Sequence, residues 1–224
     1  MKHKHQFINS LINHKVDTLM QLYHGSHGEH VLAYKKHIER VINDAVSEFP
    51  RTMALRVDVH YPPILDRGDT VCCFPNLEPG VISRFRNALN AMLEANEKVR
   101  AANGKRIYPN RVRHVWVREF SEEGKCHFHL GLFFNKDAYY HLGDYETESN
   151  LRMMIVRAWY SALGLELDDY PGLVHYPENC RYILDINNYK FSAEYCSLLN
   201  RLEYLSKYDT KVFGEEGRNF GCSR

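Results

Sequence analysis

The stretch RVRHVWVREFSEEGKCHFHLGLFF, residues 111–134, decides the fold that we predict for this chain. Its two ends are rich in β-branched and aromatic residues, and the segment SEEGK between them is typical of a turn. The pattern predicts a β-hairpin with strands over residues 111–120 and 126–134. Because successive side chains of a strand point to opposite faces, His127 and His129 would share one face, and Phe128 would point into the core.

The segments around this hairpin predict an α+β domain, in which helices pack on an antiparallel sheet. Alternating apolar residues favour a strand over 53–61, with Arg56, Asp58 and His60 on its polar face, and two short strands within 172–186. Helical spacing predicts helices over 81–104, 149–164 and 189–208. The order strand, helix, two strands, helix, strand is typical of such a fold.

Residues 1–49 are predicted to form a helical accessory segment, and residues 50–224 the main domain. Apolar residues recur at helical spacing over 7–22 and again over 31–46, and GSHGEH at 25–30 interrupts the pattern. No apolar run approaches the length of a membrane span, and the N-terminus lacks the features of a signal peptide. We therefore expect a cytoplasmic protein with reduced thiols and no membrane partner.

A metal site is predicted where the hairpin closes. Pairing around SEEGK brings residues 119–120 beside 126–127, so Glu119 would reach the face that carries His127 and His129. Two imidazoles and one carboxylate form a ligand set that suits Mg²⁺ or Mn²⁺ in phosphate chemistry at least as well as Zn²⁺. Asp58 and His60 are rival or additional ligands, and two solvent-exposed histidines on a polar face remain the alternative.

Basic residues lead into this site. Residues 98–118 contain seven Lys or Arg and no Asp or Glu, although the whole chain has a net charge of only +1. Such side chains hold most of the phosphates in protein–DNA contacts. Arg111, Arg113 and Arg118 are therefore predicted to bind DNA, and Arg218 is a further candidate. Ordinary solubilising charge is the alternative for each of them.

The segment EYLSKYDTK, residues 203–211, is a candidate source of a nucleophile. On a helix, Tyr204 and Tyr208 would share one face, and a tyrosine hydroxyl can form a covalent phosphoester. The phenol pKa is ordinarily about 10, so a nearby cation would assist ionisation. Lys207 and Lys211, each three residues after a tyrosine, are the candidates for that role, and Lys211 is also predicted to contact DNA. A pair of core aromatics is the alternative.

These motifs together resemble those of the HUH endonucleases, the initiators of rolling-circle replication. The order RVDVHY, HFHLGL, YLSK is similar to their three motifs, E-x7-HFH to their metal set, and YLSKYDTK to the two-tyrosine motif of phage initiators. More closely, residues 56–224 resemble the YagK/YfjJ family of prophage proteins, also called the inovirus replication-protein family. The matching pieces are VWVREF, HFHLGLFFNKDAY, LGDY, GLVHYPEN and RNFGCSR.

The resemblance implies a ferredoxin/RRM-like, five-stranded antiparallel sheet with the two histidines on its central strand. It implies that a metal held by Glu119, His127 and His129 polarises a DNA phosphate. Tyr204 would attack that phosphate, leaving a 3′-OH and a 5′-phosphotyrosine, and Tyr208 would be a second nucleophile.

The partners implied by the resemblance are a single-stranded DNA origin, with a hairpin origin and a host helicase as further candidates, in a bacterial host and without a small-molecule cofactor. Two other functions stay open at this point. One is a non-catalytic DNA-binding module, an origin binder or repressor, and the other is a metal-dependent phosphoesterase acting on small nucleotides. An intact set of Glu119, His127, His129 and Tyr204 favours the nickase, because a pure binder has no need of all four.

Overall fold

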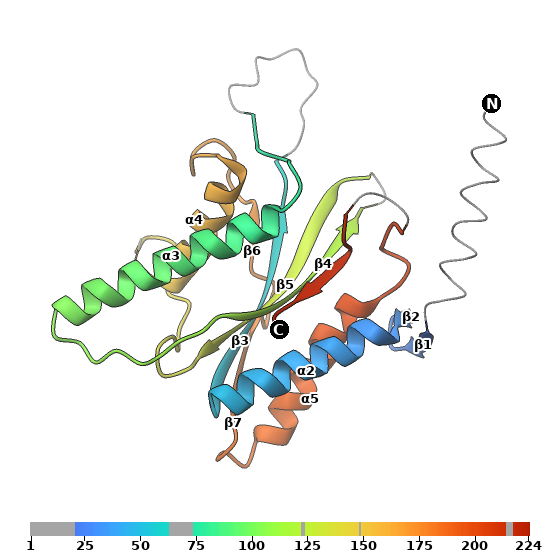
Figure 1. The fold of residues 1–224 in the computed structure, drawn as a ribbon. Coiled ribbons are helices and arrows are strands. Elements are labelled where there is room, and N and C mark those ends of the chain that lie inside the picture. Colours follow the sequence, from blue (N-terminus) through green and yellow to red (C-terminus); the bar gives the residue numbers. More distant parts are fainter. Residues whose placement is uncertain (1–20, 63–73, 122–123, 148, 214–216) are drawn as a thin grey trace.

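One antiparallel sheet organises the chain (Figure 1). The computed structural model describes residues 21–62, 74–121, 124–147, 149–213 and 217–224. The neighbouring strands of the sheet run in the order β6-β3-β5-β4-β8, and β7 pairs with β3 beside β6. The strands are β3 Arg51–His60, β4 Arg113–Phe120, β5 Cys126–Asn135, β6 Val174–His175, β7 Arg181–Asp185 and β8 Phe220–Cys222.

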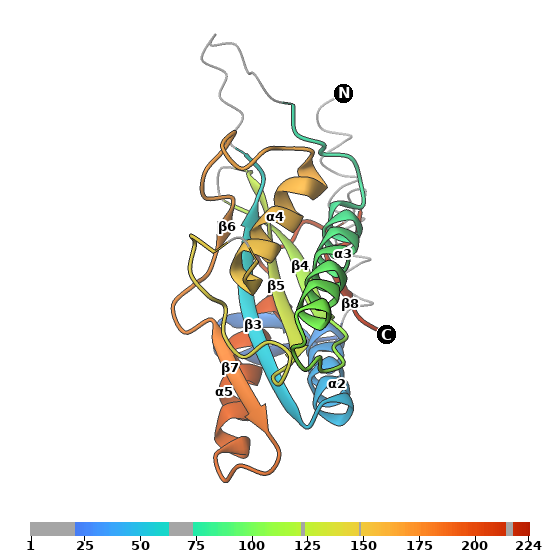
Figure 2. The ribbon, with the colours of Figure 1, turned by 90° about the vertical axis from the view of Figure 1, so that its left-hand side faces the viewer.

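The α+β class is thus confirmed, and the sheet has six described strands instead of the five expected. The extra strand is β8, a three-residue edge strand whose Gly221 packs closely against the Trp116 ring. A strand this short has too little alternation to be visible in a sequence. Figure 2 shows β6 and β7 following one another along the same edge of β3.

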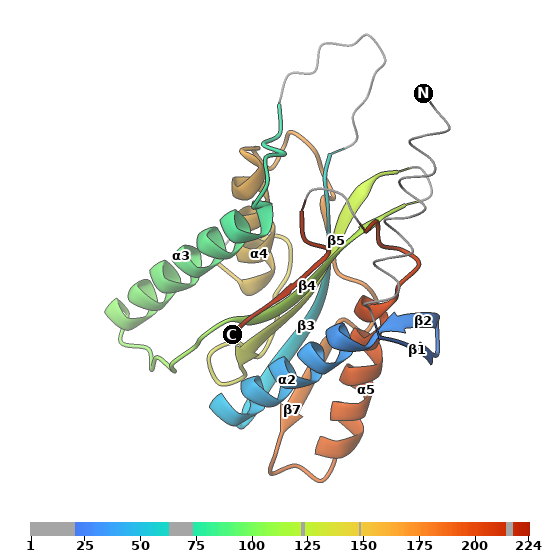
Figure 3. The same cartoon turned by 45° about the vertical axis from the view of Figure 1, so that its right-hand side comes forward.

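Among the described residues, helices cover both faces of the sheet (Figures 1 and 3). On one face lie α3 Val81–Ala102 and α4 Leu151–Leu163, whose apolar residues share a core with the inward side chains of β3 and β5. On the other face lie α2 Leu32–Glu48 and α5 Phe191–Glu203, which share a second core with Val115 and Val117 of β4. In the part of the chain that the structure describes, no helix is both long and apolar enough to cross a membrane.

The boundaries of α4 illustrate how local sequence sets these helices. The Asn150 side chain accepts a hydrogen bond from the Met153 amide at 3.0 Å, which satisfies one of the free N–H groups of the first turn. Gly164 ends the helix with φ at +67°, a left-handed conformation that glycine adopts without a steric penalty. The helices predicted over 81–104 and 149–164 are therefore confirmed to within a few residues.

The N-terminal region differs from the predicted pair of helices. The helix expected over 31–46 is α2, but residues 22–31 form a hairpin of β1 Leu22–Gly25 and β2 Gly28–Val31. Most of the other expected helix, over 7–22, lies outside the described residues. The division of the chain at residue 50 stays a prediction, although α2 buries Ile38, Val41 and Ile42 in the same core as residues of the sheet.

The last predicted helix, over 189–208, is too long at its C-terminal end. Helix α5 ends at Glu203, a short 3₁₀ turn η1 spans Tyr204–Ser206, and Lys207 is extended with φ −52° and ψ 135°. Tyr204 and Tyr208 therefore do not share a helix face, and that prediction is wrong. The helical spacing of the sequence continues past the point at which contacts with β2 turn the chain away.

Leu202 provides a test of how α5 is held against the sheet. It is fully buried in the α2–α5 core, so Leu202→Ala should lower the free energy of unfolding by about 2–5 kcal/mol in urea titrations. The matched control is Leu167→Ala, at a leucine that is 38% exposed, which should cost less than about 1 kcal/mol. Equal losses of stability in the two variants would contradict this packing.

Candidate metal and tyrosine site

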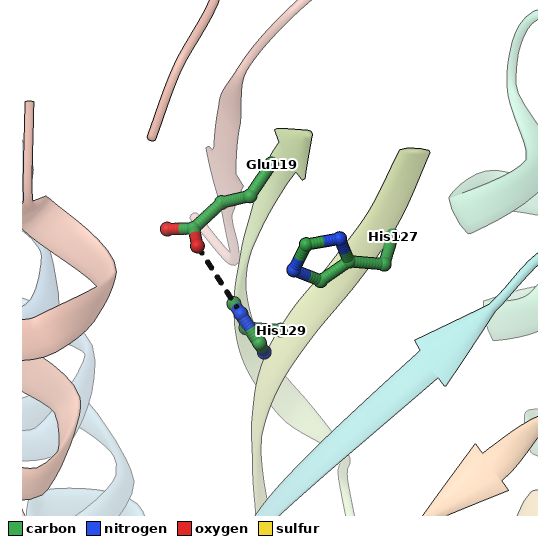
Figure 4. Close-up of side chains that lie close together, drawn as sticks. All are labelled: Glu119, His127 and His129. Carbon is green, nitrogen blue, oxygen red and sulfur yellow. Dashed lines mark ion pairs between the residues drawn. The ribbon is translucent and has the colours of Figure 1, made fainter. Parts of the chain in front are cut away.

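The predicted metal ligands come together at one end of the sheet, on the face that α5 covers. Glu119 is the penultimate residue of β4, and the register of the hairpin places it directly opposite His127 of β5. One ligand atom from each of Glu119, His127 and His129 lies within 4.8 Å of the others. Figure 4 shows the three side chains converging from two adjacent strands. The expected hairpin, its register and the central position of β5 are confirmed.

His129 is held between two carboxylates. Its Nδ1 lies 2.8 Å from Asp58 Oδ1, and its Nε2 lies 3.2 Å from Glu119 Oε2. A bound cation would replace the Nε2–H of His129, so that Nδ1–H donates to Asp58 while the Nε2 lone pair and the Glu119 carboxylate both serve as metal-ligand atoms. An imidazole that ligates a metal commonly donates its other N–H to a carboxylate in this way. The residues present therefore fit a divalent cation between Glu119 and His129.

Glu119 is a buried carboxylate that stays ionised. Only 1% of the residue is exposed, and burial by itself would raise its pKa. The hydrogen bond from His129 and the charge of Lys211 outweigh burial and lower the pKa of Glu119 to about 2. Lys211 Nζ donates to Glu119 Oε1 at 3.1 Å. The carboxylate is thus deprotonated at neutral pH, as a metal ligand must be.

Asp58 and His60, the rival ligands, have different positions. Asp58 pairs with His129 in the β3–β5 register and bonds to the nitrogen that points away from Glu119, so it orients the ligand. His60 stacks on His127, with ring centroids 5.5 Å apart. The sequence indicated no role for Arg56, whose Nη2 lies 3.0 Å from Asp58 Oδ1 at 4% exposure. The only available signal was its place on the polar face of the same strand.

Tyr204 lies beside the ligands. Its ring centroid is 5.9 Å from that of His129, in an edge-to-face arrangement. Burial raises the pKa of the Tyr204 phenol, the negative charge of Glu119 adds to that effect, and the positive charge of Arg56 opposes it. The structure thus brings one of the two predicted nucleophiles to the predicted metal ligands.

Tyr208 and Lys207 are placed differently from Tyr204. The Tyr208 ring stacks on Phe213 with centroids 5.0 Å apart, and its backbone N–H donates to the Glu29 carbonyl at 2.8 Å. Lys207 forms an isolated β-bridge with His30 of β2. The main chain of both residues is therefore engaged with the N-terminal hairpin, and the shared helix face that motivated a paired role is absent.

The residues predicted to bind DNA lie in four different places. Lys211 is inside the protein, with no exposed side-chain surface and its ammonium on Glu119, so its contact is with the site and not with solvent. Arg113 is turned toward α2, where its Nε lies 2.8 Å from Glu48 Oε2. Arg118 donates to Asn219 Oδ1 at 3.1 Å from the face opposite Glu119.

Arg111 and Arg218 both line a cleft between α3 and the β4–β8 edge. The cleft has a volume of about 580 Å³, and four arginines line it together with two glutamates: Arg86, Arg111, Arg218, Arg224, Glu94 and Glu97. Its floor includes His114, whose pKa is lowered to about 4 by burial and by the charge of Arg86. The basic residues near the cleft therefore gather on the side of the sheet away from the metal ligands.

Comparison with known proteins places this architecture in a family. Residues 12–223 match the family described as the YagK/YfjJ C-terminal domain. In Escherichia coli strain K12, the uncharacterized protein YagK is 56% identical over 92% of this chain and 99% of its own length. The uncharacterized protein YfjJ of the same strain is 42% identical over 90% of this chain and 99% of its own length. No solved structure matches the chain. The chain belongs to the YagK/YfjJ C-terminal domain family.

Proposed function

We propose that this protein is an HUH-type endonuclease, which nicks and joins single-stranded DNA through a tyrosine and so initiates rolling-circle replication of a phage, prophage or plasmid element. The observation that carries the proposal is the convergence of four side chains from separate parts of the sequence. Glu119, His127 and His129 lie within mutual reach of one cation, and the Tyr204 ring contacts the His129 ring. A DNA-binding module without catalysis does not require this convergence.

The ligand set supports phosphate chemistry. A divalent ion such as Mg²⁺ or Mn²⁺, bound by Glu119, His127 and His129, would supply Lewis-acid polarisation of a phosphodiester. Asp58 orients His129 through its 2.8 Å contact with Nδ1, and Lys211 holds the Glu119 carboxylate from the other side. Burial of these partners fixes the two ligands before any substrate arrives, which lowers the cost of organising the site.

The reaction of the tyrosine is a transesterification. The Tyr204 hydroxyl oxygen forms a bond to phosphorus, and the bond between phosphorus and the 3′ oxygen of the preceding nucleotide breaks. The phenol proton leaves, and the departing 3′ oxygen gains a proton. The products are a 5′-phosphotyrosine and a free 3′-OH. Because burial raises the pKa of Tyr204, the free protein holds this phenol protonated at neutral pH.

The arginine-lined cleft supports binding of the DNA strand. Phosphates are held chiefly by arginine and lysine. A strand that passes from the metal ligands around the β8 edge to the other face of the sheet would reach Arg218 before Arg111. Arg113 lies 2.8 Å from one carboxylate and 3.7 Å from another, so its charge is already compensated. We therefore place the strand over the cleft and not over the Arg113 side.

The first test of this function is a covalent-adduct assay. The protein is mixed with a pool of single-stranded oligonucleotides and Mn²⁺, and a denaturing gel then separates protein from protein–DNA adduct. We expect a shifted band that EDTA abolishes and that Tyr204→Phe lacks, because that change removes only the attacking oxygen. Tyr208→Phe is the matched control, and its first cleavage should stay within a few-fold of wild type. An adduct that persists in Tyr204→Phe would contradict the assignment.

Metal affinity tests the role of Asp58 without DNA. Asp58→Asn removes the charge that fixes the His129 tautomer, and loss of such a partner typically weakens metal binding about 10- to 100-fold. Titration calorimetry with Mn²⁺ measures this directly. The control is Asp185→Asn, which removes a carboxylate paired with Arg51 on the distant β7 and should leave the affinity unchanged. An unchanged affinity in Asp58→Asn would exclude Asp58 as the orienting residue.

Salt dependence tests the path of the DNA. Replacing Arg86 and Arg218 with glutamine should make the logarithm of the binding constant less dependent on the logarithm of salt, because fewer phosphates are neutralised. On a single strand the slope should change by roughly 0.7 for each phosphate that the variant no longer neutralises. Arg51→Gln, at an arginine paired with Asp137 and Asp185, is the control and should leave the slope unaltered. Equal slopes in wild type and both variants would place the strand elsewhere.

A further inference from the structure

We propose that the N-terminal hairpin, β1 with β2, is part of the tyrosine site, where it positions the turn that carries Tyr204. The inference rests on the proposed function in one respect, because it takes Tyr204 as the nucleophile. It gives a specific task to a segment of which the sequence indicated only an accessory role. The residues that act are Tyr23 and His30 of the hairpin, with Glu203 and Ser206 on either side of the tyrosine.

The main chain of β2 holds the segment that follows the turn. Tyr208 N–H donates to the Glu29 carbonyl at 2.8 Å, and His30 forms an antiparallel bridge with Lys207. The hairpin thereby fixes the point at which the chain leaves η1. A three-residue 3₁₀ turn has poor hydrogen-bond geometry of its own, so its direction depends on contacts of this kind.

A buried polar pair joins β2 to the turn itself. His30 Nδ1 lies 2.9 Å from Ser206 Oγ, and both residues are fully buried. Ser206 Oγ–H donates to the Glu203 carbonyl at 2.7 Å, so its oxygen is left to accept from His30 Nδ1–H. A neutral His30 with its proton on Nδ1 meets this requirement, and burial lowers the pKa of His30, which favours the neutral ring. The Ser206 hydroxyl therefore donates one hydrogen bond and accepts another, which fixes the orientation of the η1 turn.

Side chains of β1 and α2 hold the residue that precedes Tyr204. Tyr23 Oη–H donates to Glu203 Oε1 at 2.6 Å, and Lys35 Nζ donates to the same oxygen at 2.8 Å. The Glu203 side chain is only 14% exposed, so these bonds are poorly accessible to competing water. The side chains of Glu203, before Tyr204, and of Ser206, after it, are therefore bonded to residues within 23–35.

The hairpin is closely packed and also contacts the Tyr204 ring directly. A Cβ added at Gly25 would lie 2.8 Å from the His30 ring, so β1 approaches His30 as closely as a glycine permits. At the turn of the hairpin, the His27 ring meets the Tyr204 ring edge to face, with centroids 5.6 Å apart. Tyr204 is consequently in contact with His129 on one side and with the hairpin on another.

Loss of the contacts between the hairpin and the turn should affect the rate of tyrosine attack more than the stability of the fold. A nucleophile displaced by about 1 Å can lose about 100-fold in rate. The metal ligands, in contrast, lie on β4 and β5 and not on the hairpin. Removing the hydrogen bonds of the hairpin should thus separate two properties of the protein. Tyrosine attack should slow, while metal binding and DNA binding persist.

The experiment uses Tyr23→Phe, which removes one hydroxyl and keeps the ring. We expect the single-turnover rate of adduct formation to fall about 10- to 100-fold, with the affinities for Mn²⁺ and for the oligonucleotide within about 2-fold of wild type. The matched control is Tyr195→Phe. Tyr195 lies on α5, the helix that ends at Glu203, and its hydroxyl bonds to Asn43 of α2. Its removal should leave the rate unchanged. Equal rates in Tyr23→Phe and wild type would overturn the proposal.

His30 supplies a conservative pair of variants. His30→Leu should slow adduct formation, and His30→Asn should recover part of the rate, because an amide can still donate to Ser206 Oγ. Equal loss of rate in both variants, with a matching fall in melting temperature, would show that the contact only braces the fold and would overturn the positioning role.

Amide hydrogen exchange separates this proposal from the proposed function. The Tyr208 N–H should exchange at least about 10-fold faster in Tyr23→Phe than in wild type if the hairpin holds the segment. If wild type forms no adduct, the endonuclease proposal fails, and the exchange rate still decides whether the hairpin holds the turn. An unchanged exchange rate at Tyr208 would show that the hairpin does not hold this segment, even if adducts form.

Discussion

The pairing register between β4 and β5 is the constraint on which the rest of the structure depends. It sets Glu119 opposite His127 and Val117 opposite His129, so one face carries the ligands and the second core together. A slip of one residue would turn every side chain of a strand to the opposite face, placing Phe128 against α5 and His129 among apolar residues. Burial of Phe128 and Leu130 on the other face therefore specifies the site as well as the sheet.

A continuous series of paired charged and polar side chains extends through the site beneath the surface. Lys211 pairs with Glu119, Glu119 faces His129, His129 bonds to Asp58, and Asp58 pairs with Arg56. Each buried charge has an opposite neighbour, which offsets the cost of removing it from water. Asp58 and Lys211 also hold the side chains of His129 and Glu119, the two proposed ligands, in place. Under the proposed function, the strands would set metal affinity, and α5 with the N-terminal hairpin would set the orientation of the tyrosine turn.

The sequence predicts what depends on local periodicity and does not predict what depends on distant contacts. The hairpin over 111–134 is visible because alternation and turn composition agree, and its register follows from the length of the turn. The end of α5 is not visible, because helical spacing continues to Tyr208 while His30 and Glu29 of a remote hairpin redirect the chain. Burial of Lys211 was equally unpredictable, since a lysine after a turn ordinarily faces water.

The most direct measurement is the identification of the residue that carries DNA after the reaction. The protein is incubated with Mn²⁺ and single-stranded oligonucleotides, digested with nuclease and protease, and sequenced by tandem mass spectrometry. We expect a nucleotide joined through its 5′ phosphate to the peptide that contains Tyr204, with the modification on that phenol. A nucleotide on Tyr208 or another residue would contradict this mechanism. So would the absence of any modified peptide in a protein that binds both Mn²⁺ and the oligonucleotide.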